Sequence, residues 1–145
     1  MVSVEVNFVV PDCEQAMAFY EKVFEVQRIG LTSFAKGMNE GLFTMYGGNF
    51  HMLDENPDYS LNAPKPGDPK SMWINVVVPD IQAVFNQAVA AGSTAILPVT
   101  ENEALGMSNA MFSDPFGHVW MVHQIHREVG FKERVRIVAE SMGLE

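Results

Sequence analysis

The stretch Trp73–Asp80, WINVVVPD, nearly repeats the stretch Glu5–Asp12, EVNFVVPD. In both copies an apolar run ends in Val-Pro-Asp, and Asn75 stands at the place of Asn7. Proline favours an extended entry, and aspartate is a preferred residue at the start of a helix. Recurrence of this pattern predicts that the chain is built from two copies of one structural unit.

The residues after each copy support the repeat. Helical patterns follow both aspartates, with apolar residues on one face in each case: Ala16, Phe19, Tyr20, Val23 and Phe24, then Val84, Phe85, Ala88 and Val89. Three short apolar stretches separated by turn signals follow each helical pattern. Each half is therefore predicted to be a βαβββ module, and the fold class to be α+β.

The module boundaries follow from composition. We expect one domain over residues 1–126, with modules at 1–54 and 72–126, joined by a proline-rich linker at 55–71. Residues 127–145 lie outside the repeat and are expected to form a helical extension. Its apolar residues fall on one stripe: Phe131, Val135, Val138 and Met142.

Charge and hydropathy exclude several partners. A net charge of −9 argues against a nucleic-acid surface, because phosphate binding needs clustered lysine and arginine. No apolar run approaches the ~18 residues that a membrane span requires. Nothing resembles a signal peptide, so we expect a cytoplasmic protein without membrane partners.

Further motifs carry a family resemblance. The segments AFYEKVF (18–24) and SDPFGHVWMVHQ (113–124), together with the doubled module, resemble the vicinal oxygen chelate superfamily. This group includes glyoxalase I, extradiol dioxygenases, fosfomycin-resistance enzymes and bleomycin-binding proteins. The form DPFGH-x-W is most similar to its PhnB-like branch. The resemblance, over residues 2–124, implies two half-shells of sheet that face each other around a cavity.

The resemblance also implies four metal-ligand positions, which match Glu5, Met52, Trp73 and Met121. A divalent ion needs several oxygen, nitrogen or thiolate donors, and a thioether is a weak ligand. Glu5 is the one plausible ligand of the four. We therefore expect that the metal site is lost and that no cofactor is bound.

Strand alternation extends the list of residues expected to face the cavity. The predicted ligand-binding residues are Asn7, Phe50, Met52, Asp54, Trp73, Asn75 and Met121, with Val119 on the same face. As an alternative, the methionines and aromatics fill the core, and the two asparagines hydrogen-bond to backbone. His51 and His118 are expected to face outward or to cap turns.

Glu5 and His123 are the candidate catalytic residues. A carboxylate in an apolar cavity has a raised pKa and can act as a base near neutrality. Alternatively, Glu5, Asp54 and His123 form a displaced metal site. A third possibility is that Glu5 is merely held by Asn7 or Trp73.

Two classes of function remain open. The favoured one is a small-molecule-binding protein with an apolar cavity, whose ligand is an aromatic or cationic organic molecule stacked on Trp73 and met by Glu5. The alternative is a lyase or dioxygenase of the glyoxalase kind, with a rebuilt site that uses Glu5 and His123. We also expect a homodimer, because the apolar stripe of residues 131–142 needs a surface to cover it.

Overall fold

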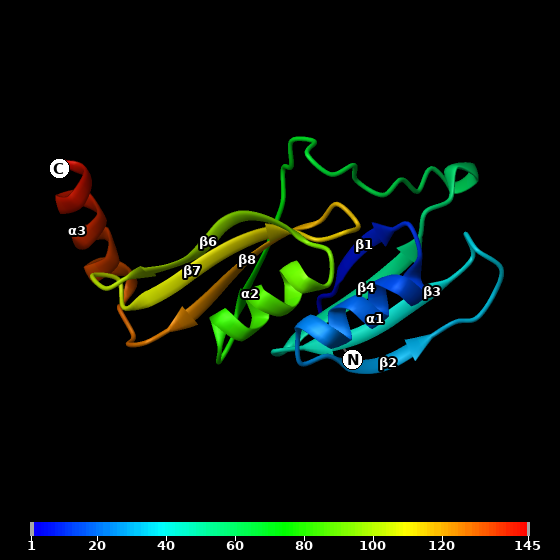
Figure 1. The fold of residues 1–145 in the computed structure, drawn as a ribbon, viewed down its shortest axis with the longest axis horizontal. Coiled ribbons are helices and arrows are strands. Elements are labelled where there is room, and N and C mark those ends of the chain that lie inside the picture. The colour runs from blue at the N-terminus through cyan, green and yellow to red at the C-terminus, as the bar shows by residue number, and fades with distance from the viewer. Residues whose placement is uncertain (1, 145) are drawn as a thin grey trace.

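The computed structural model describes residues 2–144, and its elements follow the predicted order (Figure 1). The first module contains β1 (Val6–Val10), α1 (Cys13–Val23), β2 (Gln27–Leu31), β3 (Glu40–Met45) and β4 (Gly48–Asp54). The second contains β5 (Ile74–Val77), α2 (Ile81–Ala90), β6 (Thr94–Asn102), β7 (Met107–Ser113) and β8 (Val119–Ile125). A short 3-10 helix, Pro57–Tyr59, lies in the linker, and α3 (Phe131–Met142) ends the chain. The α+β fold of two βαβββ modules is confirmed.

Each module forms its own four-stranded sheet. The strand orders are β1-β4-β3-β2 and β5-β8-β7-β6. The first strand of each module pairs in parallel with the last, and the other pairs are antiparallel. A parallel pair needs a long crossover connection, which the helix and the intervening strands provide.

The two aspartates of the repeat begin the helices as predicted. An oxygen of Asp12 accepts a hydrogen bond from the amide of Gln15 at 2.9 Å, and Asp80 accepts one from the amide of Ala83 at 3.1 Å. Each bond satisfies a first-turn amide that has no partner within the helix. Replacing such a cap by alanine typically costs about 1 kcal/mol.

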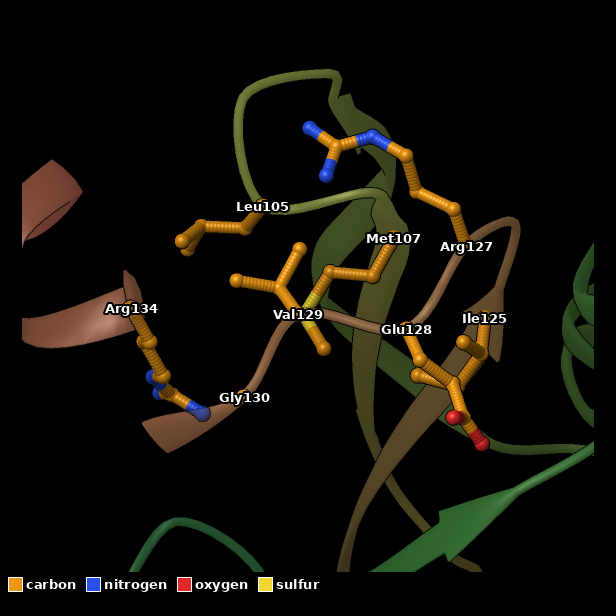
Figure 2. A pocket seen from close by; sticks show the side chains of 8 residues that line it. All are labelled: Leu105, Met107, Ile125, Arg127, Glu128, Val129, Gly130 and Arg134. Carbon is orange, nitrogen blue, oxygen red and sulfur yellow. The ribbon is translucent and has the colours of Figure 1, made fainter. Parts of the chain in front are cut away.

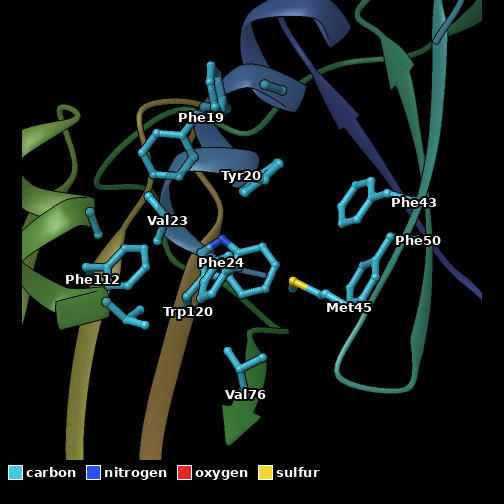
Figure 3. Packing of buried hydrophobic residues seen from close by; sticks show 14 of the residues in the cluster. Phe19, Tyr20, Val23, Phe24, Phe43, Met45, Phe50, Val76, Phe112 and Trp120 are labelled. Carbon is cyan, nitrogen blue, oxygen red and sulfur yellow. The ribbon is translucent and has the colours of Figure 1, made fainter. Parts of the chain in front are cut away.

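The helix-covered faces of the two sheets share one hydrophobic core (Figure 3). The ring of Trp120 from β8 lies 5.4 Å from Tyr20 and 4.9 Å from Phe24, both near α1, and 6.2 Å from Phe50 of β4. Helices α1 and α2 also contact each other. Because the covered faces meet in this core, the open faces are directed away from it. The expectation that two half-shells face each other around a cavity stays a prediction.

Asp114 ties the modules together at the centre of this core. Its Oδ2 accepts hydrogen bonds from the Tyr20 hydroxyl at 2.5 Å and from Trp120 Nε1 at 2.8 Å. Its Oδ1 accepts from the amides of Phe116 and His118 at 3.0 and 2.9 Å. Burial, and then the neighbouring Asp114 carboxylate, raise the pKa of Tyr20 well above its usual value. The Asp-Pro-Phe-Gly turn is thus a structural anchor.

Helix α3 is confirmed, and it extends away from the end of the second sheet (Figure 1). Among residues 2–144, no strand or other helix packs extensively against it. Its apolar stripe stays open to solvent: Phe131 is 82 % exposed, Val135 50 % and Met142 66 %. None of the helices in this part of the chain is long and apolar enough to cross a membrane.

Candidate functional site

The open faces of the two sheets carry most of the predicted site residues. Paired residues of neighbouring strands project to the same side of a sheet. Asn75 pairs with Met121, and Val77 pairs with His123. The second sheet therefore presents Trp73, Asn75, Met121 and His123 on one open face, where the alternation of the sequence placed them.

In the first sheet, three predicted site residues lie on the opposite face from the one expected. Phe50, Met52 and Asp54 lie on the helix-covered face, with 6 %, 0 % and 2 % exposure. Val6 pairs with Phe50, and Asn7 pairs with His51, so Phe50 does not share the face of Asn7. The prediction that these three residues face Glu5 is wrong.

The error arose in the β3–β4 turn. Positive φ angles occur at Tyr46 (47°) and Gly47 (82°), so these two residues form the turn, and Gly48 already belongs to β4. The sequence instead predicted a turn at Gly47, Gly48 and Asn49, with the next strand at 50–54. A shift of one residue moves every side chain of a strand to the other face.

Asp54 has a structural role in this arrangement. Its carboxylate accepts hydrogen bonds from the amides of Cys13, Gly37 and Asn39 at 2.7, 2.9 and 3.0 Å. Burial alone would raise the pKa of Asp54, but these three donors outweigh burial and hold the pKa below its usual value. Burial and the nearby Asp54 also raise the pKa of the Cys13 thiol, which keeps it protonated. Neither group is available to a metal or a ligand.

His51 takes the place that the sequence analysis assigned to Met52. Its Nδ1 lies 3.4 Å from Oε1 of Glu5, and its Nε2 lies 2.7 Å from Oε2 of Glu40. The imidazole of His51 therefore has a carboxylate beside each of its ring nitrogens. His51 and Glu40 were missed because the strand was read one residue out of phase; correct alternation from Gly48 would have found His51.

The residues present do not fit the metal that the resemblance implied. Among residues 2–144, no group of three or more His, Cys, Asp or Glu side chains is arranged to hold a metal ion. Glu5, His51 and Glu40 lie together on the first sheet but are not arranged as a metal site, and Trp73 and Met121 supply no hard donor on the second. The absence of a metal stays a prediction.

His123 lies apart from Glu5, on the other sheet. Its Nδ1 donates a hydrogen bond to Oδ1 of Asn109 at 2.6 Å. Burial, and then the Arg134 guanidinium, hold the pKa of His123 below its usual value, which favours the neutral ring near pH 7. Glu5 instead contacts His51, so the two predicted catalytic residues each have a separate partner in the chain.

A pocket of about 290 Å³ brings two predicted ligand-binding residues together. We call it the seam pocket, because it lies where β1, β5 and the linker meet. It is lined by Val6, Asn7, Phe8, Val9, Asn62, Pro64, Lys70, Met72, Trp73, Ile74, His118 and Val119. The linker was predicted only as a connection, and its proline-rich composition gave no sign that it lines a pocket.

Polar contacts organise the seam pocket. Nε1 of Trp73 donates a hydrogen bond to Oδ1 of Asn75 at 3.1 Å, which fixes the indole, although half of the side chain stays exposed. His118 reaches across from the second module, and its Nε2 donates to the carbonyl of Val9 at 2.7 Å. His118, which was expected to face outward or to cap a turn, thus contacts the first module. Lys70 donates to two backbone carbonyls of the linker.

Two βαβββ modules, each with its own four-stranded sheet, define the class of two-module proteins to which this fold belongs. Residues 3–122 match the Glyoxalase/Bleomycin resistance protein/Dioxygenase superfamily, and the chain belongs to this superfamily.

Relatives in known sequences and structures agree with this membership. An uncharacterized protein of Mycobacterium bovis is 29 % identical over 132 residues, which cover 88 % of this chain and 86 % of that protein. The fosfomycin resistance protein FosX of Listeria monocytogenes has a similar structure, with a TM-score of 0.65, 17 % identity, and coverage of 92 % of this chain and 99 % of that one. TioX of Micromonospora sp. ML1 has a TM-score of 0.62 at 18 % identity, with coverage of 89 % and 100 %. These structures share the fold.

Proposed function

We propose that this protein binds a small organic molecule in the seam pocket, with the indole of Trp73 as the surface on which the ligand stacks. The observation that carries the proposal is the meeting of Asn7 and Trp73 in one apolar-lined pocket under the linker. A few polar groups in an apolar pocket are the usual composition of a small-molecule site.

The chemistry of the pocket favours an aromatic or planar ligand. Trp73 offers an exposed aromatic face, while Asn7 and Asn62 offer amides that can hydrogen-bond to polar edges. A cationic ligand, which the acidic chain would attract, fits the Glu5 side of the first sheet better than the Lys70 side of the pocket. We therefore propose an aromatic body whose polar edge faces the asparagines.

The test combines retained ligand with fluorescence. Native mass spectrometry of the protein purified from its source should show an organic molecule that is lost on denaturation. Trp120 is fully buried, so a change in indole fluorescence on rebinding should come from Trp73 and vanish in Trp73→Phe. Trp73→Ala should weaken binding by more than about 1 kcal/mol, as truncation of an aromatic anchor does.

Phe34→Ala is the matched control, because Phe34 is an exposed aromatic residue outside the pocket lining. Equal affinities of Trp73→Ala and Phe34→Ala would show that the pocket has been placed wrongly.

A second candidate function, an enzyme of this superfamily with a rebuilt site, is favoured by the contacts of His51. We propose that Glu5 and His51, rather than Glu5 and His123, would then move protons, with Glu40 orienting the ring through the 2.7 Å contact. Turnover of a bound ligand that is lost in His51→Gln, with binding retained, would support this candidate. We propose that this chemistry uses no metal, since the donors within residues 2–144 do not make up a metal centre.

We further propose a homodimer, which the uncovered stripe of α3 and the outward-directed open faces support. Dimerisation would cover apolar surface that one chain leaves in water.

The assignment to the PhnB-like branch rests on the Ser113–Gln124 motif and stays a proposal. The expected cytoplasmic location likewise stays a prediction.

A further inference from the structure

A second hollow lies where α3 leaves the second sheet (Figure 2), and it shares no lining residue with the seam pocket. We call it the root pocket; its volume is about 390 Å³. It is lined by Leu105, Met107, Ile125, Arg127, Glu128, Val129, Gly130 and Arg134. These residues come from the β6–β7 turn, the adjoining ends of β7 and β8, the connection from β8 to α3, and the first turn of α3.

The wall of the root pocket is apolar. Leu105, Met107 and Val129 converge from three segments and surround its centre (Figure 2). Ile125 adds a branched side chain that is 40 % exposed. When an apolar group of a ligand covers this wall and removes it from water, the free energy of the complex falls.

Two arginines add positive charge to this wall. Arg127 Nη2 donates to the carbonyls of Glu103 and Ala104 at 3.0 and 2.8 Å, which fixes the guanidinium at the β6–β7 turn. Arg134 makes no side-chain hydrogen bond or ion pair with any residue in the range 2–144. Its donors are therefore free to meet a ligand.

This local charge contrasts with the rest of the chain. The net charge is −9 and there are nine lysines and arginines, yet four of them fall between residues 127 and 136. Arg136 is already held by Glu133 and Glu140, which leaves Arg134 as the uncompensated arginine of the helix that borders the pocket. Glu128 is the acidic group of the lining, and it projects away from the Arg134 guanidinium (Figure 2).

The start of α3 adds to the positive character of the pocket. Its N-cap is Gly130, which has no side chain to accept hydrogen bonds from the first-turn amides. Amides at a helix start favour a negative charge. The charge of Arg134 also reaches back to the sheet, where it helps to depress the pKa of His123.

We propose that the root pocket binds a small amphipathic carboxylate, whose anionic group meets Arg134 at the start of α3 and whose apolar body rests on Leu105, Met107 and Val129. The carboxylate accepts charge-assisted hydrogen bonds from the guanidinium, and a bidentate arrangement fits the planar geometry of both groups. A neutral molecule would offer Arg134 no negative charge, and a small hydrophilic anion would leave the apolar wall in water.

The probes are octanoate, its neutral analogue octanamide and the short anion acetate, each titrated into the full chain by calorimetry. Octanoate should bind, and octanamide and acetate should each bind at least about tenfold more weakly, because octanamide lacks the negative charge and acetate lacks the apolar body. In protein with labelled methionine methyl groups, octanoate should shift the Met107 resonance, which Met107→Leu identifies.

Arg134→Gln should weaken octanoate binding by about tenfold, since it removes the charge while keeping a polar side chain on the helix. Arg136→Gln is the matched control on the same helix, and its affinity should stay at the wild-type value. Equal affinities of Arg134→Gln and wild type, or of octanamide and octanoate, would overturn the proposal.

The result is separable from the function proposed for the seam pocket. Loss of octanoate binding in Trp73→Ala would place octanoate in the seam pocket and overturn the root-pocket proposal. Retained binding in Trp73→Ala together with loss in Arg134→Gln would support it, whatever the seam pocket binds.

Discussion

Replacing Asp114 by asparagine tests the anchor that joins the two modules. The amide keeps one oxygen for the backbone amides of Phe116 and His118 but turns an NH₂ group towards Trp120 Nε1, whose hydrogen bond of 2.8 Å is then lost. A buried donor without an acceptor costs about 1–3 kcal/mol. The Tyr20 hydroxyl can turn to accept from the amide, but it exchanges a bond to a carboxylate for a neutral one, which costs about 1 kcal/mol more.

These terms predict that Asp114→Asn lowers the free energy of unfolding by about 3 kcal/mol. With a slope of about 2 kcal/mol per molar urea, the unfolding midpoint should fall by about 1.5 M. Far-ultraviolet circular dichroism at one fixed protein concentration measures this shift, because association would make stability depend on concentration.

Two further variants calibrate the Asp114→Asn result. Asp68→Asn, in the exposed linker, should change stability by less than about 0.5 kcal/mol. Tyr20→Phe removes one donor and leaves the carboxylate bound to three others, so it should cost about 1–2 kcal/mol. A midpoint for Asp114→Asn within 0.3 M of wild type, on the order of the Asp68→Asn effect, would refute the reasoning.

Three more predictions concern pH, metal and assembly. Because the folded pKa of Asp54 is depressed, its contribution to stability is present above the unfolded value near 4 and is lost as pH falls through the folded value; the acid side of the stability profile should therefore flatten in Asp54→Asn. Zn, Ni, Fe or Mn should leave the thermal midpoint unchanged, whereas a rise of several degrees that chelator or Glu5→Gln abolishes would restore the metal site. Sedimentation should show a dimer at tens of micromolar, and truncation after Arg127 should weaken it; a 16.1 kDa monomer of the full chain would rule the dimer out.

The fold could be predicted from the sequence because the signals that specify its elements are local. Val-Pro-Asp specifies a strand end and a helix start within a few residues. The hydrogen bonds of Asp12 and Asp80 to first-turn amides confirm both helix starts. Helix α3 was equally predictable, since its stripe and its final Gly143 with a φ of 66° are local features.

The site was harder to predict, because it depends on phase and on long-range contacts. A tyrosine at positive φ is uncommon, so nothing in the sequence marked Tyr46 as the first turn residue in place of Gly48. Because of this one-residue shift, Met52 was expected on the open face where the structure has His51. Alternation assigns residues to the faces of one sheet, but it contains no information on how two sheets sit together. That arrangement depends on contacts such as Tyr20 with Asp114, 94 residues apart.

The shared core makes each half of the repeat incomplete by itself. The rings of Tyr20 and Phe24 shelter Trp120, so a separated first module would expose an aromatic face that has no other cover. We therefore expect that a chain nicked at the exposed Gly67 holds together as two complementary fragments, and that neither fragment made alone is soluble. The duplicated unit behaves as half of an obligate pair that happens to be covalently tethered.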